Sequence, residues 1–216
     1  YTHLTARIPG EEGTYLINPY GLLFHEICAS NLIKVDFEGN LIAGDYPIND
    51  AGHLIHTAVL KAREEVNFVL HSHTRAGCAV SAMKRGLLPL SQHANVVLGV
   101  LAYHGYGVVT DEKEECDLIA NDLGDKLLML MHNHGLLACG RTAREAFILH
   151  YYLEMACKIQ VDVLASGEEP ILPPARAVKT LSDYYGAWRE VESLGNEGGW
   201  ESLLRLLESK QPEYKR

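Results

Sequence analysis

The segment Val66-Asn67-Phe68-Val69-Leu70-His71-Ser72-His73 joins an apolar run to two histidines, and the whole chain is interpreted from this junction. The run predicts a buried strand over residues 66–71. Side chains two residues apart on a strand point to the same face, so His71 and His73 can reach one point in space. A third histidine, His134, follows a second apolar run at Leu127–Met131. Three histidines on rigid elements suit a catalytic metal site that keeps one coordination position open.

Strand and helix patterns extend on both sides of this segment. The strands predicted before it are 4–8, 14–17, 32–36 and 41–44, the last two as a hairpin, followed by a helix over 51–63. After it come a helix over 74–83, a connector from Pro89 toward 95–98, a strand at 101–103, a helix over 111–123, and strands at 127–131 and 135–139. Because strands and helices alternate in the middle, the pattern is typical of a mixed α/β domain.

The C-terminal part has a different character. Thr142-Ala143-Arg144-Glu145 is a capping box that predicts a long helix to about residue 165. Pro170, Pro173 and Pro174 then form a linker. We therefore predict an α/β domain over residues 1–168 and a helical tail over 169–216, with helices at 181–191 and 201–209.

Composition restricts the class of protein. The chain has 216 residues, of which 47% are hydrophobic, and a net charge of −9. This charge argues against a nucleic-acid or anionic-membrane binder, and no apolar run reaches the roughly 18 residues of a membrane span. Five widely spaced cysteines predict reduced thiols in a cytoplasmic protein. No secretory signal is visible at Tyr1, and the start without methionine leaves open a segment upstream.

Neutral imidazoles restrict the choice of ion only in part. A set of three histidines suits Zn²⁺, which is the expected ion, and also accepts Fe²⁺, Co²⁺ or Mn²⁺.

Asn133 and Gly135 flank His134. Asn133 can form a local hydrogen bond, and Gly135 allows the backbone to approach closely.

These motifs carry a resemblance to a known family. His71-Ser72-His73 followed by Asn133-His134-Gly135 is similar to the zinc signature of the class II aldolase/adducin head-domain family. Three further segments resemble that family's motifs over roughly residues 2–165: Thr2–Arg7, Asn18–Gly21, and Ala51-Gly52 with His56. The resemblance implies a three-layer α/β/α sandwich with a mostly antiparallel central sheet. It also implies a homotetramer with sites near subunit interfaces, and His71, His73 and His134 as metal ligands.

One position departs from the aldolases of this family. They carry a Ser-Ser-Glu-like motif before the His-x-His strand, and its glutamate acts as acid and base. Here the matching place reads Asn49-Asp50-Ala51-Gly52, so Gly52, or Ala51 with a shift of one residue, replaces the glutamate. This resembles the adducin-like bacterial branch. Adducin heads are regarded as having lost the metal histidines, whereas this chain retains all three.

Several residues are candidates to replace the glutamate as catalytic groups. The first is His93, which falls where family members have a glutamate or histidine near the metal. Asp50 is the second, with helix capping as its alternative role. His56, three residues from His53 on one helix face, lies near or beneath the site. Tyr184 in the tail is the fourth, because a tail tyrosine serves a neighbouring subunit in family aldolases. The remaining candidates are pocket-lining Tyr103 and His104, and a weak ligand, His132. Structural roles are expected for His3, His25 and His150.

Three functions follow from these residues. The first is a divalent-metal-dependent lyase of aldolase type, acting on a small substrate that bears a carbonyl or carboxylate, with His93 or a hydroxide ion handling the proton. The second is a non-haem iron oxygenase, which has less need of a base. The third is a non-catalytic, adducin-like assembly module in which any metal is structural.

Overall fold

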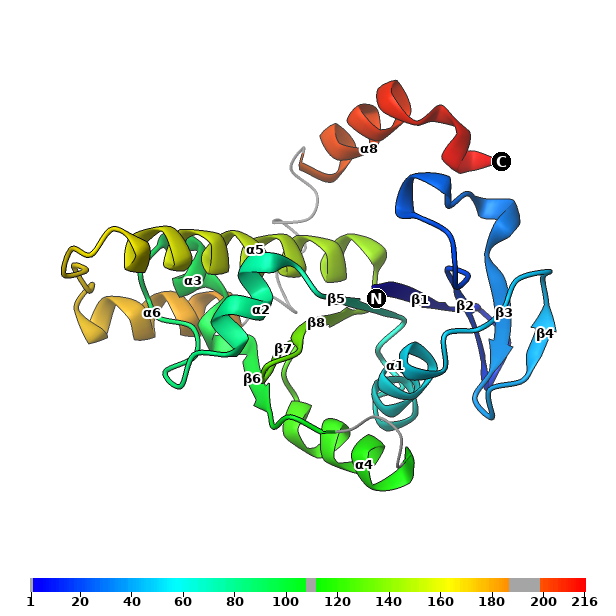
Figure 1. The fold of residues 1–216 in the computed structure, drawn as a ribbon, viewed down its shortest axis with the longest axis horizontal. Coiled ribbons are helices and arrows are strands. Elements are labelled where there is room, and N and C mark those ends of the chain that lie inside the picture. The colour runs from blue at the N-terminus through cyan, green and yellow to red at the C-terminus, as the bar shows by residue number, and fades with distance from the viewer. Residues whose placement is uncertain (1, 108–111, 187–198) are drawn as a thin grey trace.

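An eight-stranded β-sheet forms the centre of the chain (Figure 1). The computed structural model describes residues 2–107, 112–186 and 199–216. In chain order the strands are β1 (His3–Arg7), β2 (Thr14–Ile17), β3 (Ile33–Asp36), β4 (Leu41–Ala43), β5 (Phe68–Ser72), β6 (Leu101–His104), β7 (Leu128–Met131) and β8 (Gly135–Gly140). The spatial order is β4-β3-β2-β1-β5-β8-β7-β6, and only β6 and β7 pair in parallel. The predicted mostly antiparallel sheet is therefore confirmed.

Helices cover both faces of the sheet, as expected for an α/β/α sandwich (Figure 1). On one side α1 (Asp50–Ala62) packs against α4 (Glu112–Leu123). On the other side α2 (Arg75–Ser81) and α3 (Gln92–Val97) pack against the long α5 (Ala143–Ala165). Strands β7 and β8 are buried along their whole length between these layers. They read as continuous apolar runs in the sequence for that reason.

The strand β5, which carries the first histidine pair, lies in the middle of the sheet. It pairs with β1 on one side, where His3 stands opposite His71. On the other side it pairs with β8, where Leu137 stands opposite His71. Helix α5 begins as predicted, because the Thr142 hydroxyl accepts a hydrogen bond from the Glu145 amide at 3.1 Å. The Glu145 carboxylate closes this end by accepting from the Arg141 amide. The first two histidines are thus placed by a strand that is paired on both sides, and the helix α5 has a capped N-terminus.

Two predicted segments were wrong. Residues 92–97 form the helix α3 and not a connector, because the Ser91 hydroxyl caps the Ala94 amide and Val96 and Val97 turn into the core. In the tail, α6 covers Ala175–Gly186, so it begins before the predicted Leu181, and the predicted end at 191 lies outside the described residues. Helix α6 packs on α3, and such tertiary packing stabilises a helix beyond what its local sequence indicates.

The remaining elements of the described residues are α8 (Gly199–Lys210) and the short 3₁₀ turns η1 (Phe24–Glu26), η2 (Ala29–Asn31), η3 (Leu98–Val100) and η5 (Pro212–Lys215). Among them, only η3 contains a buried residue, Val100. The C-terminal segment, residues 199–216, contacts the N-terminal part of the chain. The side-chain amide of Gln211 donates a hydrogen bond to the His25 carbonyl. The division of the chain at residue 168 stays a prediction. Within the described ranges no helix has the length and apolar character to cross a membrane.

Candidate metal centre

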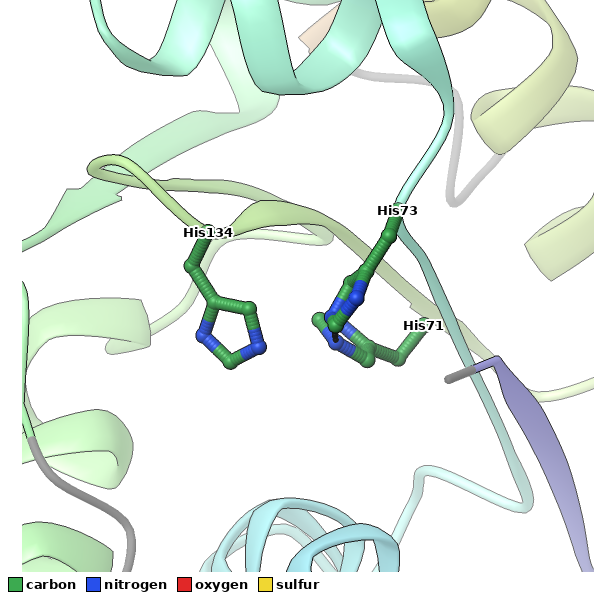
Figure 2. Close-up of side chains that lie close together, drawn as sticks. All are labelled: His71, His73 and His134. Atoms are coloured by element: carbon green, nitrogen blue, oxygen red, sulfur yellow. Dashed lines mark hydrogen bonds between the residues drawn. The ribbon is translucent and has the colours of Figure 1, made fainter.

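The three histidines of the sequence motif lie together in the structure (Figure 2). One nitrogen from each of His71, His73 and His134 can be chosen so that all three atoms lie within 4.8 Å of one another. The ring centroids of these residues are separated by 4.6 to 4.8 Å. The Nε2 atoms of His71 and His73 are 2.8 Å apart. Two strand ends thus direct three imidazoles to one place.

A tight turn brings the third histidine to the pair. Residues 132–134 connect β7 to β8, and Asn133 adopts the left-handed conformation with φ 57° that asparagine tolerates. Gly135 then passes close to the His-x-His segment. A Cβ atom at this position would lie 2.3 Å from the Ser72 carbonyl oxygen and 3.0 Å from the His73 ring. The close approach expected of Gly135 is therefore confirmed, and it sets His134 beside His73.

All three imidazoles are neutral at pH 7 in this environment. Burial lowers the pKa of His73 to about 4, and it lowers the pKa of His71 well below its usual value. The pKa of His134 is lowered by burial and by the nearby His104. Neutral rings keep a lone pair free for an ion, whereas protonated rings could not bind one. The donor set therefore fits a divalent metal.

Helix α5 holds the His-x-His segment from the opposite side of the strand. The Ser72 hydroxyl is 2.6 Å from Nε2 of His150, and the Thr74 hydroxyl donates to the Glu154 carboxylate at 2.5 Å. The same Thr74 oxygen accepts from the Gly77 amide and caps α2. These contacts flank His73 on both sides. They fix the backbone on which the metal ligands stand.

The space beside Gly52, one of the two positions that match the family's glutamate, is filled by a histidine ring. A Cβ atom on Gly52 would lie 2.8 Å from Cδ2 of His3, so the His3 ring leaves no room for a side chain there. His3 is 4% exposed and stacks on His71 with ring centroids 5.1 Å apart. Sequence reasoning gave His3 only a structural role. The missing signal was the pairing of β1 with β5, which no local pattern contains.

The candidate catalytic residues are spread over several places. His56 is fully buried beneath the site, where its ring bonds Nδ1 of His3 at 2.9 Å and the Thr5 hydroxyl at 2.8 Å. Asp50 is exposed in the first turn of α1, and the capping role belongs to Asn49, whose side chain accepts from the Gly52 amide. His93 packs against Tyr152 of α5, outside the histidine group.

The other candidate residues either have identified contacts or lie outside the part of the chain that the structure describes. The side chain of Tyr184 lies outside the described residues. Nδ1 of His132 is 3.0 Å from the Ser81 carbonyl, so its ring supports the turn. The Tyr103 hydroxyl accepts from the Leu87 amide. His104 lies between two carboxylates, Glu115 and Asp122. Of the four catalytic candidates, only His56 is linked to the three metal-site histidines through described contacts, by way of His3.

The chain also matches known proteins. Residues 1–161 match the family described as Class II Aldolase and Adducin N-terminal domain. An aldolase II superfamily protein from Pseudomonas syringae has a crystal structure that is 41% identical, with a TM-score of 0.90 over 100% of this chain and 86% of that one. An L-fuculose 1-phosphate aldolase from Glaciozyma antarctica is 28% identical, with a TM-score of 0.80 over 100% of this chain and 83% of that one.

An adducin is among the similar proteins as well. Alpha-adducin of Rattus norvegicus is 43% identical over 226 residues, which cover 97% of this chain and 30% of that protein. The chain therefore resembles both an enzyme and one part of a much longer protein of another name.

Proposed function

Because this chain belongs to the class II aldolase and adducin N-terminal domain family, we propose that it is a divalent-metal-dependent lyase of aldolase type. Its substrate is a small molecule with adjacent oxygen atoms, one of them in a carbonyl or carboxylate group. The observation that carries the proposal is the convergence of three neutral imidazoles at two strand ends. A set of three such ligands is typical of catalytic sites with an open position.

His71, His73 and His134 would hold the ion, with Zn²⁺ as the proposed metal. When bound, a divalent ion supplies Lewis-acid polarisation of the substrate oxygen atoms. The chain itself orients the ligands. His3 packs against the His71 ring, and Ser72 and Thr74 fix the backbone on either side of His73. Such supporting contacts commonly change metal affinity by about 10- to 100-fold.

The substrate differs from that of the sugar-phosphate aldolases in one respect. The two serines that would precede the glutamate in those enzymes are absent from Asn49–Gly52. We therefore propose an unphosphorylated oxygenated substrate. Family membership also supports a cytoplasmic homotetramer, which light scattering on the purified protein would test.

Metal content and carbon-acid exchange test the function together. Purified protein should contain close to one ion per chain by elemental analysis, and His73→Ala should remove it. His25→Ala is the matched control, because His25 is exposed in η1 and should leave the metal content unchanged. The zinc-loaded protein should then exchange the carbon-bound hydrogens of dihydroxyacetone with solvent deuterium, as followed by NMR. A His73→Ala protein that keeps its metal refutes the ligand assignment.

An adducin-like assembly module is the second candidate. It is favoured by the 43% identity to alpha-adducin and by Ala51-Gly52 at the place of the glutamate. A protein that neither contains nor takes up metal would support this alternative and exclude the lyase. An iron-loaded protein that consumes O₂ with an added substrate would instead favour the oxygenase.

A further inference from the structure

We infer that the substrate of the proposed site is a carboxylate with a hydroxyl or carbonyl group on the neighbouring carbon, and that its carboxylate supplies a negative charge which the protein does not; this rests on the proposed lyase function. The ligand set consists of three imidazoles. An imidazole binds an ion through the lone pair of a neutral ring, so it cancels none of the ion's charge. That charge is left for the molecule in the open position to balance.

The wall behind the ligands carries no negative charge either. The His3 ring stacks on His71 with centroids 5.1 Å apart, and Nδ1 of His3 is 2.9 Å from Nε2 of His56. The Thr5 hydroxyl ends this chain of contacts, 2.8 Å from the other nitrogen of His56. All four residues are at most 4% exposed. Because a histidine is either neutral or positive and a threonine is neutral, this wall cannot balance the charge of a cation.

A carboxylate at position 52 is excluded by the same wall. A Cβ atom on Gly52 would lie 2.8 Å from Cδ2 of His3. The charge of Glu115 reaches His134, but Oε1 of Glu115 is 3.0 Å from Nε2 of His104, and His104 acts on His134 in the opposite direction. Within the described part of the chain, no carboxylate oxygen is grouped with the three imidazoles. The ligands and their surroundings therefore leave a divalent ion with its full positive charge.

Burial makes a charge at this place costly. His71 is 1% exposed, and its Nδ1 atom is buried without a hydrogen-bond partner in the part of the chain that the structure describes. Away from water an unbalanced charge is unfavourable, and opposite charges attract one another more strongly than in solution. A substrate that brings one negative charge is thus favoured over a neutral one.

The number of protein ligands favours a chelating substrate. Figure 2 shows the three rings converging from the end of β5 and from the turn before β8. A zinc ion with three protein ligands has a fourth position for substrate and can expand to a fifth. A carboxylate oxygen and an oxygen on the neighbouring carbon fill both positions in one five-membered ring. This geometry explains why the second oxygen belongs on the carbon next to the carboxylate.

Glycolate and glycolamide form the test pair, because they have the same shape and the same hydroxyl and differ in charge. By calorimetry the zinc-loaded protein should bind glycolate roughly tenfold or more tightly than glycolamide, and inorganic phosphate more weakly than glycolate. Equal affinities for glycolate and glycolamide overturn the inference and leave the lyase intact. Tighter binding of phosphate overturns the carboxylate in favour of a phosphate group. Failure of the zinc-loaded protein to bind any of the three probes overturns the proposed function and the inference with it.

His3→Asp and His3→Asn are matched variants, because they place a carboxylate or an amide of the same size beside His71. The preference for glycolate over glycolamide should fall by roughly tenfold in His3→Asp, whose own carboxylate balances the ion, and should persist in His3→Asn. Zinc content and thermal unfolding establish that both variants are loaded and folded. Equal preferences in the two variants overturn the role of the missing charge. If either variant fails to fold, the comparison of the three probes on the wild type decides alone.

Discussion

The imidazole ring of His3 stacks on the ring of His71, with centroids 5.1 Å apart and planes inclined by 26°. The contact joins the first strand of the chain to the first histidine of the candidate centre. Behind it His56 and Thr5 continue a buried chain of hydrogen bonds. A residue near the start of the sequence thus supports a ring that lies nearly seventy residues later in the chain.

Removal of the His3 ring should weaken metal binding. His3→Ala leaves the His71 ring without its stacking partner, so we expect zinc affinity to fall by roughly tenfold. Competition with a chelating dye measures this affinity. His25→Ala changes a histidine that is exposed in η1 and serves as the control. Equal affinities for His3→Ala and wild type would show that the stack does not position His71.

Restoring a glutamate at position 52 should destabilise the fold. The new side chain would collide with the His3 ring, and overpacking of this kind costs about 1–3 kcal/mol. The double variant Gly52→Glu with His3→Ala should lose less stability than the sum of the single variants, because the second change removes the obstacle. Urea unfolding of all four proteins measures the coupling. Simple additivity would contradict the assignment of this space to His3.

The hydroxyl of Thr74 should matter for both stability and metal binding. Thr74→Val removes the cap of α2 and the bond to Glu154, and the loss of a cap alone costs about 1 kcal/mol. Zinc affinity should fall in parallel, because His73 precedes this residue. Ser209→Ala, which also removes a hydroxyl from a helix but at an exposed position in α8, should change neither quantity. An altered stability with unchanged zinc affinity would separate the cap from the site.

The stability of the metal-free protein should fall as the solution is acidified. Burial lowers the pKa of His150 to about 4 from 6.5, so the unfolded chain binds a proton in this window and the folded chain does not. Stability therefore rises with pH between about 4 and 6.5 and is lost on acidification. His150→Gln should flatten this dependence in urea titrations of chelator-treated protein. An unchanged slope would assign the pH dependence to the other buried histidines.

Metal binding has its own pH window. Burial lowers the pKa of His73 from 6.5 to about 4, so protons compete with the ion for this ring only as the pH approaches 4. Zinc should dissociate as the pH falls toward 4, earlier in His3→Ala than in the wild type. Dialysis at stepped pH followed by elemental analysis measures the release. Retention of full zinc below pH 4 would exclude imidazole ligands.

The local sequence was sufficient for much of the fold. Strand β2 and helix α5 have the extents that period and capping predict, because apolar alternation and the Thr142 cap act within a few residues. His71 and His73 meet as their spacing of two residues predicts, although β5 ends at Ser72 and His73 follows it. Helix α3 was missed because its six residues give too short a pattern, and its burial depends on α5.

The sequence by itself determined which residues are the candidate metal ligands, since histidines at the ends of apolar strands can be read from spacing and burial pattern. Only the tertiary structure decided their surroundings. The pairing of β1 with β5 placed His3 in the space beside Gly52. Such contacts join residues far apart in the chain, so their partners are chosen by sheet register and helix packing, which no local pattern encodes.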